Sequence, residues 1–294
     1  MQFASSRAKG IVALVMLAWV FATMGVFARY LDLSFDLFEQ TYLRIGLAFL
    51  FASILFYRHL DFAHFKSMPR KDVGVLIFRS ICLYLAVVLI TEAFLNTKYS
   101  NASFVATLPL LPVFGYLLLG ETIKFRTILY IALGFVGFTL ITVSDFASFS
   151  VGYGEMMAFG SMILFDLSYV GRRWHSNHLN NYESTVFMFA VGTVFLFTTS
   201  MLLGEGLPTS DLFTTSVIGV LIIASLFNVV NLYLTNYGFE HVKVAVAGNI
   251  LTLEVVFALL YSLFLFQEVP ILREIIGGAL IVTSVYLVNK SEAN

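Results

Sequence analysis

The sequence predicts an all-α membrane protein whose ten transmembrane helices form two inverted five-helix repeats, residues 1–147 and 148–294. The first observation is a series of about ten apolar stretches, each roughly twenty residues long and enough to cross a hydrocarbon core of about 30 Å as a helix. The second is composition, because 59% of the 294 residues are hydrophobic and 12% are charged, against about 25% charged in soluble domains. The third is an internal repeat at half the chain length.

The apolar stretches set the bounds of the ten expected helices. Each stretch is bounded by polar or turn-forming residues, which mark the loops. The helices are expected over residues 10–28, 37–57, 73–95, 101–120, 126–144, 152–171, 183–204, 214–239, 244–266 and 272–289. These spans leave no room for a folded soluble domain.

Lysine and arginine residues in the loops predict the orientation of the chain. Cytoplasmic loops carry an excess of these residues. With the N-terminus in the cytoplasm, the loop cations on the outer side are Arg29, Lys98 and Arg273. Those on the inner side are Arg7, Lys9, Arg58, Lys66, Arg70, Lys71, Lys124, Arg126, Arg172, Arg173, Lys243 and Lys290. We therefore expect a multi-pass protein of the cell (inner or plasma) membrane with both termini in the cytoplasm.

The internal repeat appears when the chain is shifted by half its length. Glu121 and Arg126, just after one apolar stretch, then fall on Glu268 and Arg273, just after another. Each half holds five spans, an odd number, so the two halves enter the membrane in opposite senses. Inverted repeats are typical of secondary transporters, whose substrate site lies near the bilayer midplane between the repeats.

Short motifs give this layout a resemblance to a known family. Leu253-Glu254 and, after an apolar stretch, Phe266-Gln267-Glu268 resemble the LEP and LGE signature of the EamA family in the drug/metabolite transporter superfamily. The first half carries Leu118-Leu119-Gly120-Glu121 in the matching place. Tyr42-Leu43-Arg44 resembles the arginine that family members often show in the second span, and Arg172-Arg173 resembles the basic end of the sixth.

The chain also departs from the family pattern. Val255 stands where the signature has proline, Gln267 stands where it has glycine, and Pro109 and Pro112 are displaced from the expected position. These departures bear on where helices bend. The resemblance implies a metabolite carrier, often an exporter of amino acids or related compounds, and leaves the substrate and proton coupling undecided.

Ionisable residues inside the spans are candidates for function, because a charged group in hydrocarbon is costly. Glu254 lies about ten residues into its span, so roughly 15 Å deep. It is interpreted as a structural carboxyl, a contact for a cationic group of the substrate, or a carrier of a coupled proton. Arg79 and Asp166 lie at matched depth on the third and sixth spans, which permits an ion pair that is structural or closes a gate. Arg44 is expected to extend to the outer interface.

Uncharged polar and aromatic residues complete the predicted substrate site. Asn228 and Asn231 are three residues apart on one face of the eighth span, and Asn249 offers a comparable face on the ninth. Buried amides need partners, so these residues either bond between helices or line a wet cavity. We favour the cavity because two neighbouring spans contribute. Further candidates for substrate contact, which could equally pack between helices, are Trp19, Tyr84 and Tyr169.

Several kinds of chemistry find no support in the sequence. Cys82 is the single cysteine, the five histidines fall in or near cytoplasmic loops, and no metalloprotease or phosphate-binding motif occurs. We therefore assign no catalytic residue, metal ligand or cofactor. The net charge of −1 argues against a nucleic-acid partner. The expected partners are a small-molecule substrate and the lipid bilayer, and a homodimer is left open.

Three functional classes remain at this stage. A secondary carrier is favoured by the inverted repeat and the polar groups near the midplane. A channel or a receptor-like binding protein would have the same topology, and would show conductance or ligand binding without carrier-type exchange. An intramembrane enzyme would require a nucleophile and a base, which the sequence does not supply.

Overall fold

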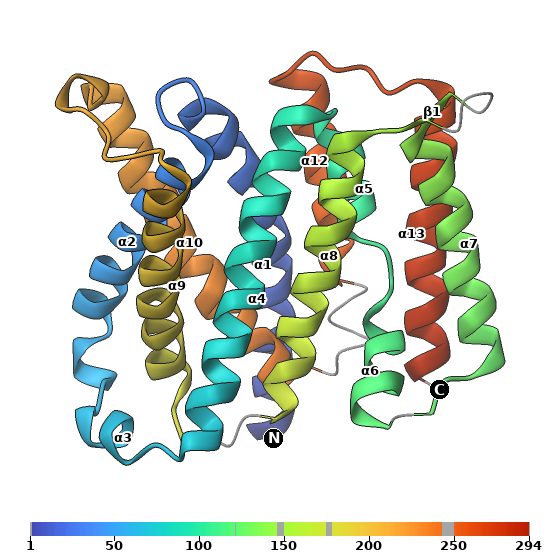
Figure 1. Ribbon diagram of the computed structural model, residues 1–294. Coiled ribbons are helices and arrows are strands. Elements are labelled where there is room, and N and C mark those ends of the chain that lie inside the picture. The colour runs from blue at the N-terminus through green and yellow to red at the C-terminus, as the bar shows by residue number, and fades with distance from the viewer. Residues whose placement is uncertain (1, 121, 146–149, 175–177, 243–249, 294) are drawn as a thin grey trace.

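The computed structural model describes residues 2–120, 122–145, 150–174, 178–242 and 250–293, which form a helical bundle (Figure 1). The helices are α1 (Gln2–Leu31), α2 (Leu37–Leu55), α3 (Phe62–Ser67), α4 (Arg70–Asn96), α5 (Tyr99–Ala106), α6 (Leu111–Leu119), α7 (Phe125–Thr142), α8 (Tyr153–Gly171), α9 (Asn181–Leu203), α10 (Thr215–His241), α12 (Leu253–Phe264) and α13 (Leu272–Ala293). Single 3₁₀ turns are η1 (Tyr57–His59), η2 (Arg172–Trp174) and η3 (Ser210–Leu212). Strands β1 (Val143–Asp145) and β2 (Ser150–Val151) form a small antiparallel pair between the two halves.

Helix α1 begins and helix α13 ends at the same end of the bundle, at the bottom of Figure 1. We call this the lower end, and the opposite end, where α1 ends and α13 begins, the upper end. The arrangement agrees with an even number of crossings.

Seven helical segments of the described chain are long and apolar enough to cross a membrane. They are Ala8–Leu31, Arg70–Asn96, Tyr99–Leu119, Phe125–Thr142, Asn181–Leu203, Thr215–His241 and Leu272–Ser291. Helices α2 and α8 have 19 residues each and are less apolar, because each carries an acidic residue in its first turn and another charged residue further along. Helix α12 is shorter, at 12 residues. The predicted total of ten spans therefore remains a prediction.

The span expected over residues 101–120 is broken in its middle. Helix α5 ends at Ala106 and α6 begins at Leu111, with Pro109 between them and Pro112 in the first turn of α6. Proline donates no backbone hydrogen bond and disfavours helical geometry at the residue before it, so the helix stops there. The expected span is nevertheless matched, because residues Tyr99–Leu119 together are long and apolar enough to cross a membrane.

The helices of the two halves pack in matched pairs. Helix α4 packs against α8 as α10 packs against α1, and α4 contacts α9 as α10 contacts α2. Likewise α6 contacts α8 as α12 contacts α1, while α2 pairs with α9 and α7 with α13. Each helix in these pairs therefore makes the same contacts as the helix about 147 residues away along the chain.

One backbone detail repeats at the same spacing. Gly120 has φ of 68°, and Gln267, 147 residues later, has φ of 55°. The left-handed region suits glycine and strains other residues. This geometry explains why a glycine is expected in the signature, and why Gln267 is an unfavourable occupant. Glu121, which follows Gly120, lies outside the described residues.

The α7–α13 pair relies on glycine for close approach. A Cβ atom added at Gly137 would lie 2.5 Å from the carbonyl oxygen of Gly277, and one added at Gly277 would lie 2.7 Å from that of Gly137. Both distances are too short for a carbon–oxygen contact. The small residues therefore let the two backbones touch, as small residues do in membrane helix pairs.

Capping interactions fix where α9 and α2 begin. The backbone N–H of Glu183 donates to Oδ1 of Asn180 at 2.9 Å, and the N–H of Asn180 donates to Oε2 of Glu183 at 2.8 Å, a reciprocal capping box. At the upper end, the Glu205 carboxylate accepts from the N–H groups of Phe38 and Glu39 in the first turn of α2. These bonds hold the α2–α9 pair in place beside the central helices.

Candidate functional site

A cavity of about 520 Å³ lies between the two halves of the bundle. Residues of α1, α2, α4, α5, α6, α8, α9, α10, α12 and α13 line it. The interruption between α5 and α6 borders it through Thr107 and Pro109, and Thr252 borders it just before α12 begins. An interrupted helix thus borders the cavity, and transporters commonly hold their substrates at such interruptions.

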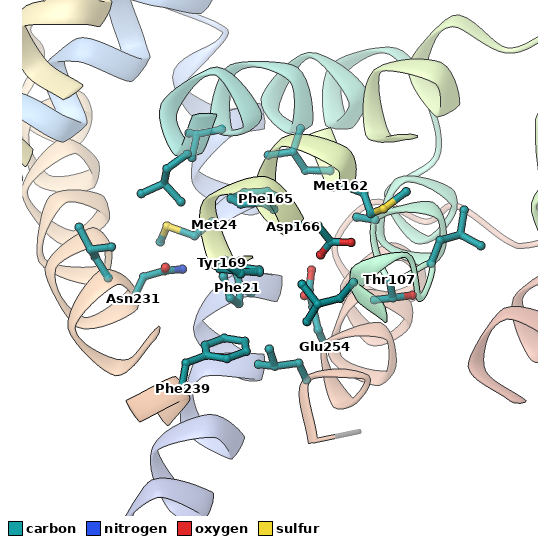
Figure 2. A pocket seen from close by; sticks show the side chains of 18 of the residues that line it. Phe21, Met24, Thr107, Met162, Phe165, Asp166, Tyr169, Asn231, Phe239 and Glu254 are labelled. Atoms are coloured by element: carbon teal, nitrogen blue, oxygen red, sulfur yellow. The ribbon is translucent and has the colours of Figure 1, made fainter. Parts of the chain in front are cut away.

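Two carboxyl groups face each other inside this cavity. Asp166 projects from α8 and Glu254 from α12, and Figure 2 shows their side chains pointing toward one another. Asp166 is 8% exposed, and its Oδ2 atom is buried without a hydrogen-bond partner among the described residues. No ion pair within the described chain involves either carboxyl. Both carboxyls are therefore available to a ligand.

The expected ion pair between Arg79 and Asp166 is not formed among the described residues. The Arg79 guanidinium instead donates from Nε to the carbonyl of Ser168 at 3.0 Å and from Nη2 to Oδ1 of Asn236 at 3.5 Å. Ser168 Oγ donates back to the carbonyl of Arg79 at 3.0 Å. Arg79 thus joins α4, α8 and α10 beside the cavity, and Asp166 is left facing the cavity.

Aromatic rings form one wall of the cavity. Tyr169 stacks on Phe239 with ring centroids 4.9 Å apart and on Phe165 with centroids 6.1 Å apart. Phe21 of α1 meets Phe165 edge-on at 6.2 Å. Figure 2 shows these rings on one side of the two carboxyls. Tyr84, on another side, is 2% exposed and its hydroxyl has no partner in the described chain.

The amides predicted on the eighth span lie where the sequence analysis expected them. Asn228 and Asn231 of α10 both line the cavity, and Figure 2 shows Asn231 among the lining side chains. Asn228 Nδ2 donates to the carbonyl of Ala224 at 2.9 Å, within the same helix. Its Oδ1 has no bond in the described chain. Asn249 lies outside the described residues.

Trp19 lies elsewhere. It does not line the cavity formed by the described residues; its ring packs against Phe227 with centroids 5.4 Å apart and is 41% exposed on the surface of the bundle. Met16, about one turn earlier in α1, is 49% exposed as well, so this part of the helix surface turns outward. We therefore remove Trp19 from the predicted site.

Arg44 is a site residue that the sequence analysis misplaced. It is 3% exposed rather than extended to the interface, and it lines the cavity from α2. Its Nε donates to the carbonyl of Gln40 at 3.2 Å, whereas its Nη2 has no partner among the described residues. The resemblance of Tyr42-Leu43-Arg44 to the family pattern was the sequence signal that pointed to it.

Above the cavity, polar side chains from four helices and two loops form a cluster that we call the upper cluster: Arg29, Lys98, Asn101, Glu155, Glu268 and Glu274. Arg29 Nη1 and Glu268 Oε1 form an ion pair at 2.7 Å, and the Tyr99 N–H donates to Glu268 Oε2 at 2.7 Å. Lys98 Nζ pairs with Glu274 Oε2 at 2.8 Å. Asn101 Nδ2 donates to both Glu274 and Glu155.

A stack of rings lies beneath these charges. Phe94 stacks on Tyr99 with centroids 4.5 Å apart, and Tyr99 stacks on Phe266 at 5.1 Å. The Arg29 guanidinium lies 4.2 Å from the centroid of the Phe266 ring, a cation–π contact. Phe94 also lines the cavity. The stack and the upper cluster therefore separate the cavity from the upper end of the bundle.

Comparison with family models decides the class of protein. The model described as the EamA-like transporter family matches residues 8–143 and again 152–290. The chain belongs to the EamA-like transporter family. The resemblance drawn from the short motifs is confirmed, and the protein is a multi-pass membrane transporter of a family that acts on small molecules across a lipid bilayer.

Individual relatives agree with this assignment. An uncharacterized transporter from Archaeoglobus fulgidus is 26% identical over 284 residues, which covers 95% of each chain. A solved crystal structure superposes with a TM-score of 0.66 at 15% identity and covers 99% of both chains. At this identity the structural match shows a shared fold. Neither relative names a substrate.

Proposed function

We propose that this EamA-family protein is a secondary carrier of a small polar metabolite, such as an amino acid or a related compound, and that it works by alternating access. The observation that carries the proposal is a central cavity that holds two facing carboxyls and is closed above by the upper cluster. A carrier needs such a binding site near the middle of the membrane and one closed end at a time.

The packing of the helices supports alternating access by two inverted five-helix repeats, residues 1–147 and 148–294. If ten spans are present, the two halves have opposite orientations in the membrane. Exchanging the conformations of the two halves then closes the end of the cavity that was open and opens the opposite end. The matched contacts of α4 with α8 and of α10 with α1 provide the pair of near-equivalent interfaces that this exchange requires.

The two remaining functional classes fit these observations less well. A channel needs a continuous path when it conducts, whereas here an ion pair and stacked rings cover one end of the cavity. The enzyme class fits less well because both the matching family model and the relative from Archaeoglobus fulgidus describe a transporter. A carrier does not require a path that is open to both sides of the membrane at once.

The loop charges support an orientation with the upper end outside and both termini in the cytoplasm of the cell membrane. That the carrier is an exporter is proposed on the family resemblance alone. The orientation is tested by fusing a reporter after Asn294 and a second within residues 58–72. Both reporters are expected to behave as cytoplasmic. An external signal from either would refute the orientation.

Counterflow in liposomes tests the carrier proposal. Purified protein is reconstituted with one unlabelled compound inside, drawn from a panel of basic, neutral and acidic amino acids and their amines, and the same labelled compound is added outside. A carrier accumulates label transiently above equilibrium for its substrate. Equilibration without overshoot for every compound that enters would identify a channel, and binding without entry would identify a receptor-like protein.

A further inference from the structure

We propose that the substrate is a small molecule with a net positive charge, whose amine lies between Asp166 and Glu254 and whose anionic group lies at Arg44, as in a basic amino acid. The inference rests on the proposed carrier function and narrows its substrate class. It depends on the charges, unpartnered atoms and rings of the cavity.

The first step is the carboxyl pair. Asp166 and Glu254 point toward one another across the cavity, and neither is held by an ion pair within the described chain. Oδ2 of Asp166 is buried and unpartnered there. Two facing carboxylates repel each other, and a cation between them removes the repulsion and supplies the missing hydrogen bonds. The pair is therefore suited to an ammonium group.

The second step distinguishes an organic amine from an inorganic cation. The rings of Phe165, Tyr169 and Phe239 stand beside the carboxyls (Figure 2). Ring faces attract organic cations and cover their methylene groups. A metal ion would instead favour three or more acidic or histidine ligands, and no such group occurs in the described chain. The wall thus favours an amine on an alkyl chain.

The third step is the anionic end. Arg44 lines the same cavity, is almost fully buried, and has its Nη2 atom unpartnered among the described residues. The hydroxyl of Tyr84, also in the lining, is unpartnered in the same part of the chain. A buried guanidinium binds a carboxylate through charged hydrogen bonds. In Figure 1, α2, which carries Arg44, lies left of α1 and α4, and α12, which carries Glu254, lies right of them. The helices that carry the guanidinium and this carboxyl therefore stand on opposite sides of α1 and α4.

The fourth step adds the charges. Among the described lining residues, the charged ones are Arg44, Asp166 and Glu254, so the ionised cavity carries one net negative charge. Arg79, nearby, is already bound to Ser168 and Asn236 and does not line the cavity. A molecule with two cationic groups and one carboxylate balances this charge. A neutral amino acid would leave one carboxylate uncompensated.

Three compounds that differ by one group each test the proposal. Lysine has both amines and the carboxylate, norleucine lacks the side-chain amine, and cadaverine lacks the carboxylate. Binding to purified protein is measured by ligand-induced thermal stabilisation, and exchange is measured by liposome counterflow. We expect lysine to bind and exchange, with norleucine and cadaverine each binding at least about tenfold more weakly, since each loses a charged hydrogen-bonding group.

Substitutions in the cavity test which side chain binds which charged group of lysine. Glu254→Gln and Asp166→Asn should each weaken lysine binding by about tenfold or more and reduce the preference for lysine over norleucine. Arg44→Gln should weaken lysine binding but not cadaverine binding, because cadaverine has no carboxylate for Arg44 to bind and is repelled by its positive charge. Asp211→Asn, which alters an exposed carboxyl in η3, is the matched control and should bind lysine normally.

The outcomes separate this inference from the carrier function. Exchange of a neutral or acidic compound that does not depend on Glu254 and Asp166 would overturn the inference and leave the carrier intact. Lysine binding that depends on both carboxyls, without counterflow, would support the inference and refute the carrier. Failure of lysine and cadaverine to bind wild-type protein, or stabilisation by Na⁺ alone that both carboxyl variants abolish, would overturn the inference.

Discussion

Replacing Glu268 by glutamine is expected to weaken the closure of the upper end. Glu268 accepts from Arg29 at 2.7 Å and from the Tyr99 N–H at 2.7 Å. Hydrogen bonds to charged groups contribute about 1.5–3 kcal/mol, against about 0.5–1.5 kcal/mol for neutral pairs, so the two weakened bonds represent roughly 2 kcal/mol. The Arg29 and Glu268 side chains are 17% and 23% exposed, and solvent screening reduces this to about 1.4 kcal/mol. The population open at the upper end should rise about tenfold.

Cysteine labelling measures this change. In a Cys82→Ala background, Thr91→Cys places a thiol in the cavity lining, and a membrane-impermeant maleimide is added to the side that faces the upper end. We expect labelling about ten times faster when Glu268→Gln is added, because labelling requires the upper end to open. Glu205→Gln, which removes a hydrogen-bonded carboxylate at the same end of the bundle but outside the upper cluster, is the control. Equal labelling rates with and without Glu268→Gln would refute the gate.

Three further changes test the backbone and the site. Gln267→Gly should stabilise the protein toward thermal unfolding in detergent by about 1 kcal/mol, and Gly120→Ala should destabilise it by about as much, because both positions have left-handed φ. Destabilisation by Gln267→Gly, or stabilisation by Gly120→Ala, would contradict the left-handed backbone at that position. Gly137→Leu should lower the unfolding temperature markedly, since its side chain would enter the backbone of α13 at Gly277, and unchanged stability would show that α7 and α13 do not touch there. Glu254→Gln should reduce substrate binding and exchange together, whereas loss of pH-driven uptake with preserved exchange would assign a coupled proton to this carboxyl, and normal transport in both assays would make it structural.

The sequence was sufficient for the helical layout and for part of the cavity. Hydropathy locates stretches that avoid water, and the motifs around Glu254 and Glu268 identified the family. The spacing of Asn228 and Asn231 correctly placed both amides on one face of α10, and that face lines the cavity. These features are local, because they depend on residues a few positions apart in one helix.

Features that depend on how the helices are rotated relative to one another could not be predicted from the sequence. Hydropathy does not distinguish a face toward lipid from a face toward another helix, so Trp19 was placed inside and Arg44 at the interface. Matched depth made an Arg79–Asp166 pair reasonable, but Arg79 turns toward Asn236 of α10. The contact of Arg29 with Glu268 joins residues 239 positions apart. Both residues were assigned to loops from the sequence, and nothing in the loop pattern predicted that they form an ion pair.

The most direct test of alternating access is whether the two ends of the cavity respond in opposite directions. Leu119, the last residue of α6, lines the lower part of the cavity, and Leu119→Cys can be labelled from the side that faces the lower end. The carrier account predicts that Glu268→Gln speeds labelling of Thr91→Cys from one side and does not speed labelling of Leu119→Cys from the other, because the protein that opens at the upper end is withdrawn from the population open at the lower end. Faster labelling at both positions would contradict alternating access and favour an open pore.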